Sequence, residues 1–409
     1  MPGLPTMLDL VLAVVAAFVG GALAKRLRQP PVLGYLLVGV LVGPSGAGLL
    51  RDTERIGTLA QAGVAFLMFL AGTELSYSQL RRMGSAALIG PFLLLLLMAP
   101  LGVGAVFLTR FPPLETAYLG LILYLSSTTV LVKLLSERGE LDTPHGRTGV
   151  AFSIVQDLPM VPALALVAAL SGPFLKAPSG LTAIPILVSL GKALLFVVVA
   201  YSLGTKAVPV LLRWVAPYGR EMFILFAVAV ALGMAYLTTV LGLSPVLGAF
   251  IAGLVVAESE VRYKVLREVS PLSDLFVTFF FLSVGMLIDL RFLVVHLHGV
   301  LGVLGLAVVV TGFLVMLVGL AFRLPARSAF LMGLGLAQMG EEAFVVAQGA
   351  LAHGVIRPEY YSLFLAAAGA SILLNPPLYQ GGTSLLRRLG RLPLLGRPFQ
   401  EGPQSFLGA

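Results

Sequence analysis

Runs of about 20 apolar residues recur along almost the whole chain, and each is long enough to cross the hydrocarbon core of a bilayer as a helix. The 409-residue chain is 58% hydrophobic and only 11% charged, whereas soluble domains are about one-quarter charged. The short alternating segments of a transmembrane barrel do not occur in it. The sequence therefore predicts an all-α integral membrane protein that crosses the bilayer many times.

Thirteen spans can be drawn, at roughly 8–24, 32–49, 56–74, 85–108, 115–135, 147–171, 182–205, 221–240, 244–257, 271–289, 294–322, 326–351 and 359–379. Assigning the loops alternately to the two sides puts 20 of the 27 basic residues on one side and six on the other, with Lys192 inside the seventh span. The basic side is cytoplasmic by the positive-inside rule. We therefore expect a protein of the inner cell membrane with its N-terminus outside and its C-terminus inside. This distribution also explains the net charge of +8 without a nucleic-acid partner.

Three short patterns recur in the second half of the chain at nearly the same offset. Residues 31–34 with Gly39 recur as 245–248 with Gly253, an offset of 214. The other two pairs, at offsets of 218 and 213, are Ser153-Ile154 with Asp157 and Pro159 against Ser371-Ile372 with Asn375 and Pro377, and Gly72 against Gly285. Six spans plus one is an odd displacement, so equivalent helices point in opposite directions. We expect two inverted six-helix repeats, 1–180 and 219–380, with a linker helix in 181–218 and a cytoplasmic tail in 381–409; secondary transporters use such repeats.

The sixth span carries a carboxylate, Asp157, near its middle, beside Gln156 and Pro159. Placing an acid there costs about 2.5–3.5 kcal/mol on insertion scales, so a chain keeps it only where it faces water or a partner. Asp157 is thus the first functional candidate. No other acid lies at the middle of any span from the first to the eleventh, which argues against an aspartyl protease, because that mechanism needs two acids sharing a proton.

The fifth and twelfth spans correspond under the repeat, and polar residues interrupt both. These residues are Ser126, Ser127, Thr128 and Thr129 in the fifth span, and Gln338, Gly340, Glu341 and Glu342 in the twelfth. Interruptions at equivalent places predict two broken helices, whose ends offer carbonyls to a cation. Glu341 and Glu342 point about 100° apart on a helix, so only one can face the broken ends. Asn375 either caps a half-helix end or makes an ordinary interhelical hydrogen bond.

The sequence resembles the Kef-type branch of the second monovalent cation–proton antiporter family over residues 8 to about 380. The resemblance rests on Leu125–Thr128, Glu137-Arg138, Gly146-Arg147, Gln156-Asp157, Leu247–Phe250, Ala252-Gly253, Phe280-Phe281, Val284–Met286, Ile288-Asp289, Gln338, Glu341 and Ala343–Val345. It implies a homodimer of thirteen-span protomers, each with a dimer-forming domain and a six-helix core made of spans 4–6 and 11–13. Two departures stand out. Residues 381–409 show no beginning of the nucleotide-binding regulatory domain common in the family, so any regulatory domain or subunit lies outside this chain. Relatives also often have a lysine in span 11 near the ion-binding aspartate, whereas this chain has no lysine or arginine between Val294 and Phe322.

These observations predict an antiporter, not an enzyme, that exchanges K⁺ or Na⁺ for protons by alternating access and without net charge movement. Asp157 would be the shared carrier, Gln156, Ser127, Thr128 and Ser126 would complete the ion and proton site, and Thr129, Gln338, Glu341 and Asn375 would support the broken helices. No cofactor or resident metal is expected, and the partners are the bilayer, the cation and the proton. The alternatives are a channel-like or regulatory membrane protein of the same fold, and an organic-ion transporter on this architecture.

Overall fold

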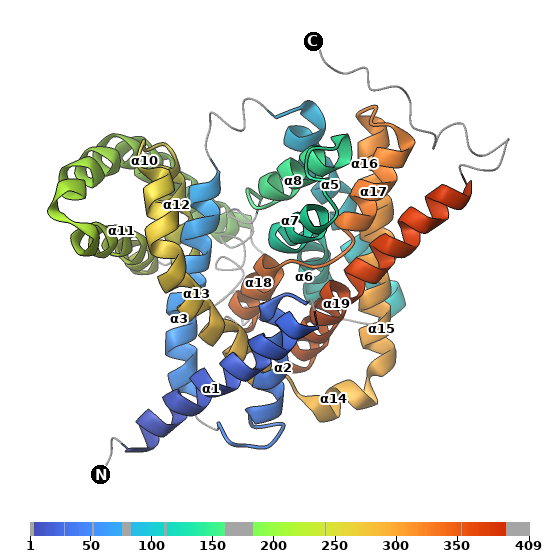
Figure 1. The fold of residues 1–409 in the computed structure, drawn as a ribbon, viewed down its shortest axis with the longest axis horizontal. Helices are drawn as coiled ribbons and strands as arrows, with labels where there is room; N and C mark the ends of the chain where they lie inside the picture. The colour runs from blue at the N-terminus through green and yellow to red at the C-terminus, as the bar shows by residue number, and fades with distance from the viewer. Residues whose placement is uncertain are drawn as a thin grey trace. The chain divides into compact units, whose positions relative to one another are not determined.

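The computed structural model describes residues 4–27, 29–50, 53–75, 83–109, 113–159, 183–241, 243–352 and 354–389, and all of the regular secondary structure in them is helical (Figure 1). Seven of the helical stretches in this part of the chain are long and apolar enough to cross a membrane. The prediction of an all-α membrane fold is confirmed at this level.

The chain divides into two compact units. Unit 1 contains residues 1–82, 157–300 and 344–366, and unit 2 contains residues 83–156, 301–343 and 367–409. The helices of unit 1 include α1 (Leu4–Arg26), α2 (Pro31–Val42), α3 (Thr53–Glu74), α10 (Ala183–Val215), α11 (Arg220–Val240), α12 (Pro245–Ala257), α13 (Arg262–Met286) and α14 (Leu290–Val295). Those of unit 2 include α5 (Ser85–Thr109), α6 (Pro113–Tyr124), α7 (Thr128–Glu137), α8 (Pro144–Gln156), the π-helical turn η3 (Leu306–Thr311), α16 (Gly312–Ala321) and α17 (Ala326–Gly335). The division passes through α15 (Leu297–Gly305), α18 (Glu341–Ala352) and α19 (Pro358–Leu389).

Glycines bring the helices of unit 1 into backbone contact. A Cβ atom on Gly39 of α2 would lie 2.3 Å from the Leu282 carbonyl oxygen of α13, and one on Gly285 would lie 2.2 Å from the Leu36 carbonyl oxygen. In the same way, Cβ atoms on Gly72 of α3 and Gly253 of α12 would lie 2.2 Å and 2.1 Å from carbonyl oxygens of the other helix. Only glycine permits such an approach, which gives apolar helices their van der Waals contact in a membrane.

The glycines of the second span serve contacts within this chain. Besides Gly39, Gly34 meets the Gly20 carbonyl of α1 and Gly43 meets Met286 of α13. All three glycines therefore pack against helices of the same chain.

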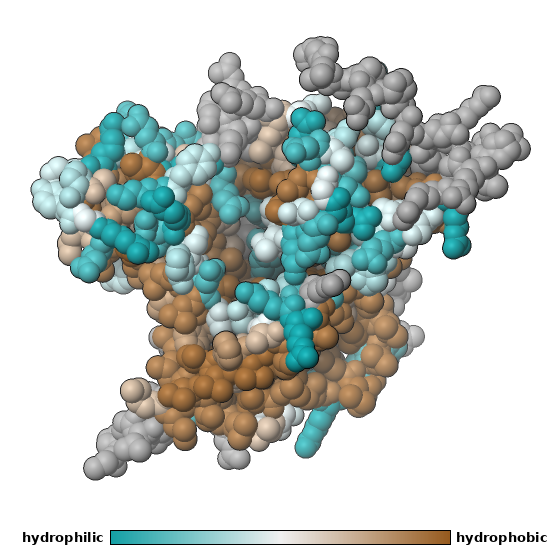
Figure 2. Space-filling view, in the orientation of Figure 1, coloured by the Kyte–Doolittle hydropathy of each residue, from teal (hydrophilic) through white to brown (hydrophobic). Residues whose placement is uncertain are grey.

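Large apolar side chains of α1 and α2 point outward. They include Leu8, Val11, Val15, Phe18, Leu23, Leu37 and Leu41. Figure 2 shows the region of these two helices covered by hydrophobic (brown) atoms. A surface of this kind suits contact with lipid, because apolar side chains cost nothing there.

Two helix ends differ from the limits of the predicted spans. The sixth span was expected to be helical through Asp157 to residue 171, but α8 ends at Gln156 and a turn follows at 157–159; residues 160–171 lie outside the described part. The tenth span was expected to begin at residue 271, but α13 begins at Arg262. Hydropathy marks where a helix is apolar, whereas backbone hydrogen bonding marks where it begins and ends, so charged helical turns escape an estimate based on apolar runs.

Candidate functional site

Two interrupted helices meet in unit 2, at the two places where the sequence predicts breaks. The chain is not helical at 125–127, between α6 and α7, or at 336–340, between α17 and α18. The two breaks are joined by hydrogen bonds: the Gly340 N–H donates to the Leu125 carbonyl (2.9 Å), and the Ser126 hydroxyl donates to the Leu336 carbonyl (2.9 Å). These two hydrogen bonds satisfy backbone groups that would otherwise stay unpaired in the hydrocarbon core of the membrane.

Gln338 binds the backbone of Ser127 on both sides of the residue. Its amide donates to the Ser127 carbonyl (3.0 Å), and its side-chain oxygen accepts from the Ser127 N–H (3.3 Å). The neighbouring glycine is required here, because a Cβ on Gly340 would lie 2.8 Å from the Ser127 nitrogen. The two broken segments therefore form one tightly packed crossing.

Neutral donors cap the C-terminal ends of the two half-helices that enter the crossing. At the end of α6, the Gln156 amide donates to the Tyr124 carbonyl (2.8 Å) and the Thr311 hydroxyl donates to the Leu123 carbonyl (3.3 Å). At the end of α17, the Asn375 amide donates to the carbonyls of Leu334 (2.8 Å) and Gly335 (3.4 Å). Asn375 thus caps a half-helix end through a hydrogen bond between α19 and α17, so the two readings of this residue describe one contact.

A carboxylate accepts hydrogen bonds at the N-terminal end of α7. Glu341, the first residue of α18, accepts from the hydroxyls of Ser127 and of Thr129, the latter at 2.7 Å. Ser127 also caps α7, because its Oγ accepts from the Val130 N–H (3.1 Å). Negative charge is stabilised at helix N-termini, so Glu341 complements the positive ends of both α7 and α18.

The second acid of the pair is oriented differently. Glu342 is 5% exposed, and its Oε2 lies 2.5 Å from the position that a Cβ on Gly340 would take. Of the two acids, Glu341 is therefore the one that accepts from the hydroxyls at the start of α7. Adjacent side chains point about 100° apart on a helix, so Glu342 faces elsewhere.

Asp157 is the first residue after α8, in the turn that ends this helix, and is 7% exposed. The preceding residue, Gln156, is fully buried, and its Oε1 has no hydrogen-bond partner among the described residues. The buried Oγ1 of Thr128, at the start of α7, also has none there. Two buried neutral oxygens of unit 2 thus lack a hydrogen-bond partner among the described residues, and one of them belongs to the residue next to Asp157.

One acid escaped the sequence analysis. Asp274 is exposed and lies midway along α13, with Arg262 and Met286 at the two ends of the helix. In the predicted tenth span, 271–289, Asp274 is the fourth residue, so its place at the middle of α13 does not make it an acid at the middle of a span. The first turns of α13 carry charged residues such as Arg262 and Arg267, so the centre of this helix differs from the centre of its apolar part.

The comparisons with known proteins agree on one family. The family described as "Sodium/hydrogen exchanger, transmembrane" matches residues 14–380. The chain is 34% identical over 379 residues to the putative cation/proton antiporter YbaL of Escherichia coli (strain K12), with 92% of this chain and 68% of that protein covered. It is 35% identical over 380 residues to K(+) efflux antiporter 5 of Arabidopsis thaliana, with 91% of this chain and 66% of that protein covered.

A third relative carries a different name. The chain is 32% identical over 379 residues to the iron transporter MagA of Paramagnetospirillum magneticum (strain ATCC 700264 / AMB-1), covering 91% of this chain and 84% of that protein. Among solved structures, the sodium proton antiporter MjNhaP1 of Methanocaldococcus jannaschii superposes with a TM-score of 0.68 at 18% identity, covering 93% of this chain and 98% of that one. This likeness shows the fold. The chain belongs to the transmembrane sodium/hydrogen exchanger family, as a membrane domain of its Kef-type branch, and the proteins of this family are transporters and not enzymes.

Proposed function

We propose that this protein exchanges a monovalent cation, K⁺ or Na⁺, for protons across the inner cell membrane, with Asp157 as the shared carrier. The observation that carries the proposal is the crossing of two broken helices in unit 2. On the helices there, the buried oxygens of Gln156 and Thr128 have no hydrogen-bond partner in the part of the chain that the structure describes. Oxygen ligands suit a hard monovalent cation. The names of the relatives, cation/proton and K⁺ efflux antiporters, point to the same exchange.

One carboxylate is sufficient to couple the two fluxes. Asp157 can hold a proton or a cation but not both, so alternating exposure of this group to the two sides moves them in opposite directions. An empty, charged Asp157 crosses poorly because its desolvation is expensive, which prevents an uncoupled leak. In this mechanism Ser126, Ser127, Thr128 and Gln156 set the geometry around the cation, and Thr129, Gln338, Glu341 and Asn375 hold the broken helices.

Equivalent contacts support the inverted repeat on which alternating access depends. The offset of about 214 carries Gly39 onto Gly253 and Gly72 onto Gly285, so the contact between Gly39 and Gly285 corresponds to the contact between Gly253 and Gly72. The contact of Gly34 with the Gly20 carbonyl likewise has its counterpart in Gly248 with the Met234 carbonyl. We propose thirteen spans in two inverted halves, 1–180 and 219–380, joined by the linker helix in 181–218, with the N-terminus outside, the tail 381–409 inside, and two such chains in a homodimer.

The decisive experiment uses proteoliposomes with an internal pH dye, challenged with each alkali cation in turn and with Fe²⁺ because of the name of MagA. We expect K⁺ or Na⁺ to drive saturable proton movement. Saturation separates an antiporter from a channel-like protein. Organic ions in the same assay test the alternative of an organic-ion transporter on this architecture. Proton movement driven by none of the monovalent cations would contradict the proposal.

Competition at one site makes the apparent affinity depend on pH. We expect the cation KM to rise about tenfold for each unit of pH decrease in the acid range, where the carrier is mostly protonated. Competition leaves the maximal rate unchanged, but a higher cation concentration is needed to reach it. Initial rates at several pH values, with equal pH on both sides, measure this. A cation KM that stays constant over the active range would exclude a shared site.

The exchange is expected to move no net charge. The C-terminal ends at the crossing are capped by neutral groups, Gln156, Thr311 and Asn375, and span 11 has no lysine or arginine between Val294 and Phe322 that could release a second proton. A potassium–valinomycin potential during Na⁺-driven exchange, or a protonophore clamp if K⁺ is the substrate, should leave the rate unchanged. A rate that follows the voltage would contradict this stoichiometry and would make Glu341 and Lys133 of α7 the candidates for the second proton site.

A further inference from the structure

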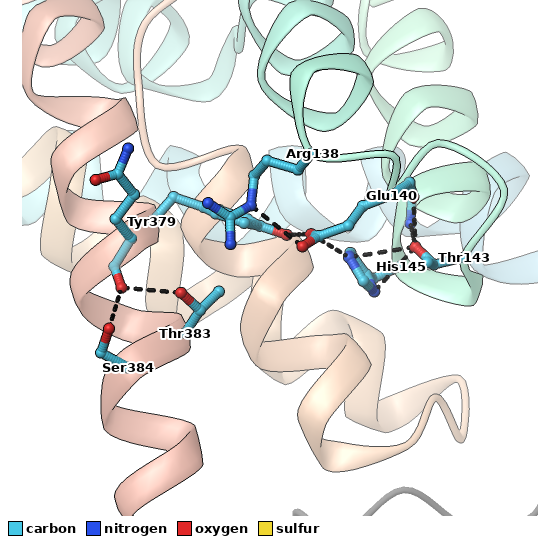
Figure 3. A network of polar contacts seen from close by, with 9 residues as sticks. Arg138, Glu140, Thr143, His145, Tyr379, Thr383 and Ser384 are labelled. Atoms are coloured by element: carbon cyan, nitrogen blue, oxygen red, sulfur yellow. Dashed lines mark hydrogen bonds and ion pairs between the residues drawn. The ribbon is translucent and has the colours of Figure 1, made fainter.

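A cluster of polar side chains joins the loop after α7 to α19, at the opposite end of α7 from the crossing (Figure 3). We call Arg138, Glu140, Thr143, His145 and Tyr379 the loop cluster. Glu140 lies at its centre: one carboxylate oxygen accepts from Arg138 Nε (3.1 Å), and the other accepts from the Tyr379 hydroxyl (2.7 Å) and lies 3.2 Å from His145 Nε2. The Arg138 guanidinium also lies 5.2 Å from the centre of the Tyr379 ring.

The loop itself is fixed against the first turn of α8. The Thr143 hydroxyl donates to the Glu140 carbonyl (2.5 Å) and accepts from the Gly146 N–H (3.1 Å). A Cβ on Gly146 would lie 2.1 Å from the Glu140 carbonyl oxygen, so loop and helix touch without an intervening side chain. The carboxylate of Glu140 is thereby held in place relative to α8.

The loop cluster joins three helices, α7, α8 and α19, that also contribute to the crossing of the broken helices. α7 begins beside Ser127, and α8 ends with Gln156, which caps α6. In α19, Tyr379 follows Asn375, the cap of α17, by four residues, so both side chains lie on one face of the helix. A change at the loop cluster can therefore move the groups that hold the half-helix ends.

His145 is the group in this cluster that can titrate near neutral pH. It is 8% exposed, and the charged or titratable groups around it are Glu140 and Arg138 of the loop, Tyr379 of α19 and Arg327 of α17. Burial lowers the pKa of His145; the Glu140 carboxylate opposes this, and the charges of Arg327 and Arg138 reinforce it. Burial alone would raise the pKa of Glu140, but hydrogen bonds from Tyr379, His145 and Arg138 outweigh burial and hold it below its usual value.

The sign of the pH effect follows from these two shifts. The arrangement seen here contains a charged Glu140 and a neutral His145 at neutral pH. Because the pKa of His145 is lowered in this arrangement, the arrangement is favoured above that pKa and is destabilised as the pH falls through it. A protonated His145 would bring a third positive charge close to Arg138 and Arg327.

We propose that Glu140, His145 and Tyr379 form a proton-sensitive tie that positions α8 and α19 for transport, and that protonation of His145 loosens the tie and slows exchange. The inference rests on the proposed function and adds a site of pH control separate from the carrier. Competition at Asp157 acts on the cation KM, whereas the tie acts on the maximal rate at saturating cation. The two effects can therefore be measured apart.

The experiment records the maximal rate against pH in proteoliposomes at saturating cation. Wild type is expected to lose rate on the acid side, and His145→Gln, which keeps a polar side chain that cannot gain charge, should retain about tenfold more rate than wild type one pH unit below the wild-type midpoint. His296→Gln, a histidine at the end of α14 outside the cluster, is the matched control and should follow wild type.

Two further variants test the charges around His145. Arg327→Gln removes a positive charge near His145 and should shift the acid side of the rate profile to higher pH. Glu140→Gln removes the carboxylate at the centre of the tie and should lower the maximal rate at every pH. An acid side of the profile that is identical in wild type, His145→Gln and Arg327→Gln, or a change confined to the cation KM, would overturn the inference. Absence of cation-driven proton flux in wild type would instead contradict the proposed function, and a His145→Gln variant that fails to fold leaves the Arg327→Gln shift as the test.

Discussion

Asp157→Asn is expected to reduce cation-driven proton exchange to background, a loss of at least about 100-fold, because the amide can neither release a proton nor neutralise a cation. Asparagine keeps the volume of the side chain and its capacity for hydrogen bonds. The purified variant should therefore elute and unfold like wild type, and the loss should be one of transport alone. The measurement is the initial rate of dye response in proteoliposomes at saturating cation.

Asp142→Asn provides the matched control, since Asp142 is an exposed aspartate in the loop between α7 and α8. It should exchange at the wild-type rate. Asp274→Asn tests the other acid that lies midway along a helix, and it separates the effect of losing the carrier from that of losing another helical carboxylate. Undiminished exchange in a correctly folded Asp157→Asn variant would exclude Asp157 as the carrier.

Glu341→Ala is expected to lower the maximal exchange rate by about tenfold or more and to reduce thermal stability. The variant leaves the hydroxyls of Ser127 and Thr129 without their acceptor and removes the negative charge at the N-terminal ends of α7 and α18. A hydrogen bond to a charged group contributes about 1.5–3 kcal/mol, and the loss of one such bond is enough to change a conformational population by roughly tenfold or more. Glu341→Gln should be intermediate, because it keeps an acceptor and loses the charge.

Glu359→Ala is the control for this substitution, because Glu359 is an exposed glutamate in the first turn of another helix, α19. It should change neither quantity. Rates in proteoliposomes and unfolding temperatures in detergent give the two readouts. A Glu341→Ala variant with wild-type rate and wild-type unfolding temperature would show that the crossing does not depend on this carboxylate.

Sequence alone determined the class of the protein and the location of its interruptions. Apolar runs of membrane-spanning length leave a chain few choices besides transmembrane helices, and the polar residues of 126–129 and 338–342 interrupt two such runs at equivalent places. Both breaks are present in the structure, within two residues of those polar groups. The residues shared with the Kef-type branch likewise identify the family without the tertiary structure.

Tertiary structure decided which groups meet at those breaks. Gln338 binds Ser127 across 211 residues of chain, Ser126 reaches Leu336 across 210, and Tyr379 reaches Glu140 across 239. Hydrogen bonds of this kind depend on the path of the backbone between the partners, and no local pattern in the sequence encodes it. For the same reason the choice of Glu341 over Glu342, and of Asn375 as a helix cap, required the folded chain.

The ends of α8 and α13 also required the structure. The apolar run around Asp157 continues beyond this residue, yet the helix stops at Gln156, whose amide binds the end of α6. The apolar run of α13 begins well inside the helix, since its first turns carry charged residues such as Arg262 and Arg267. Hydropathy reports the preference of a segment for lipid, whereas helix ends are decided by which backbone groups find partners in neighbouring segments. The position of Asp157 in a turn, and that of Asp274 at the centre of a helix, are therefore consequences of packing.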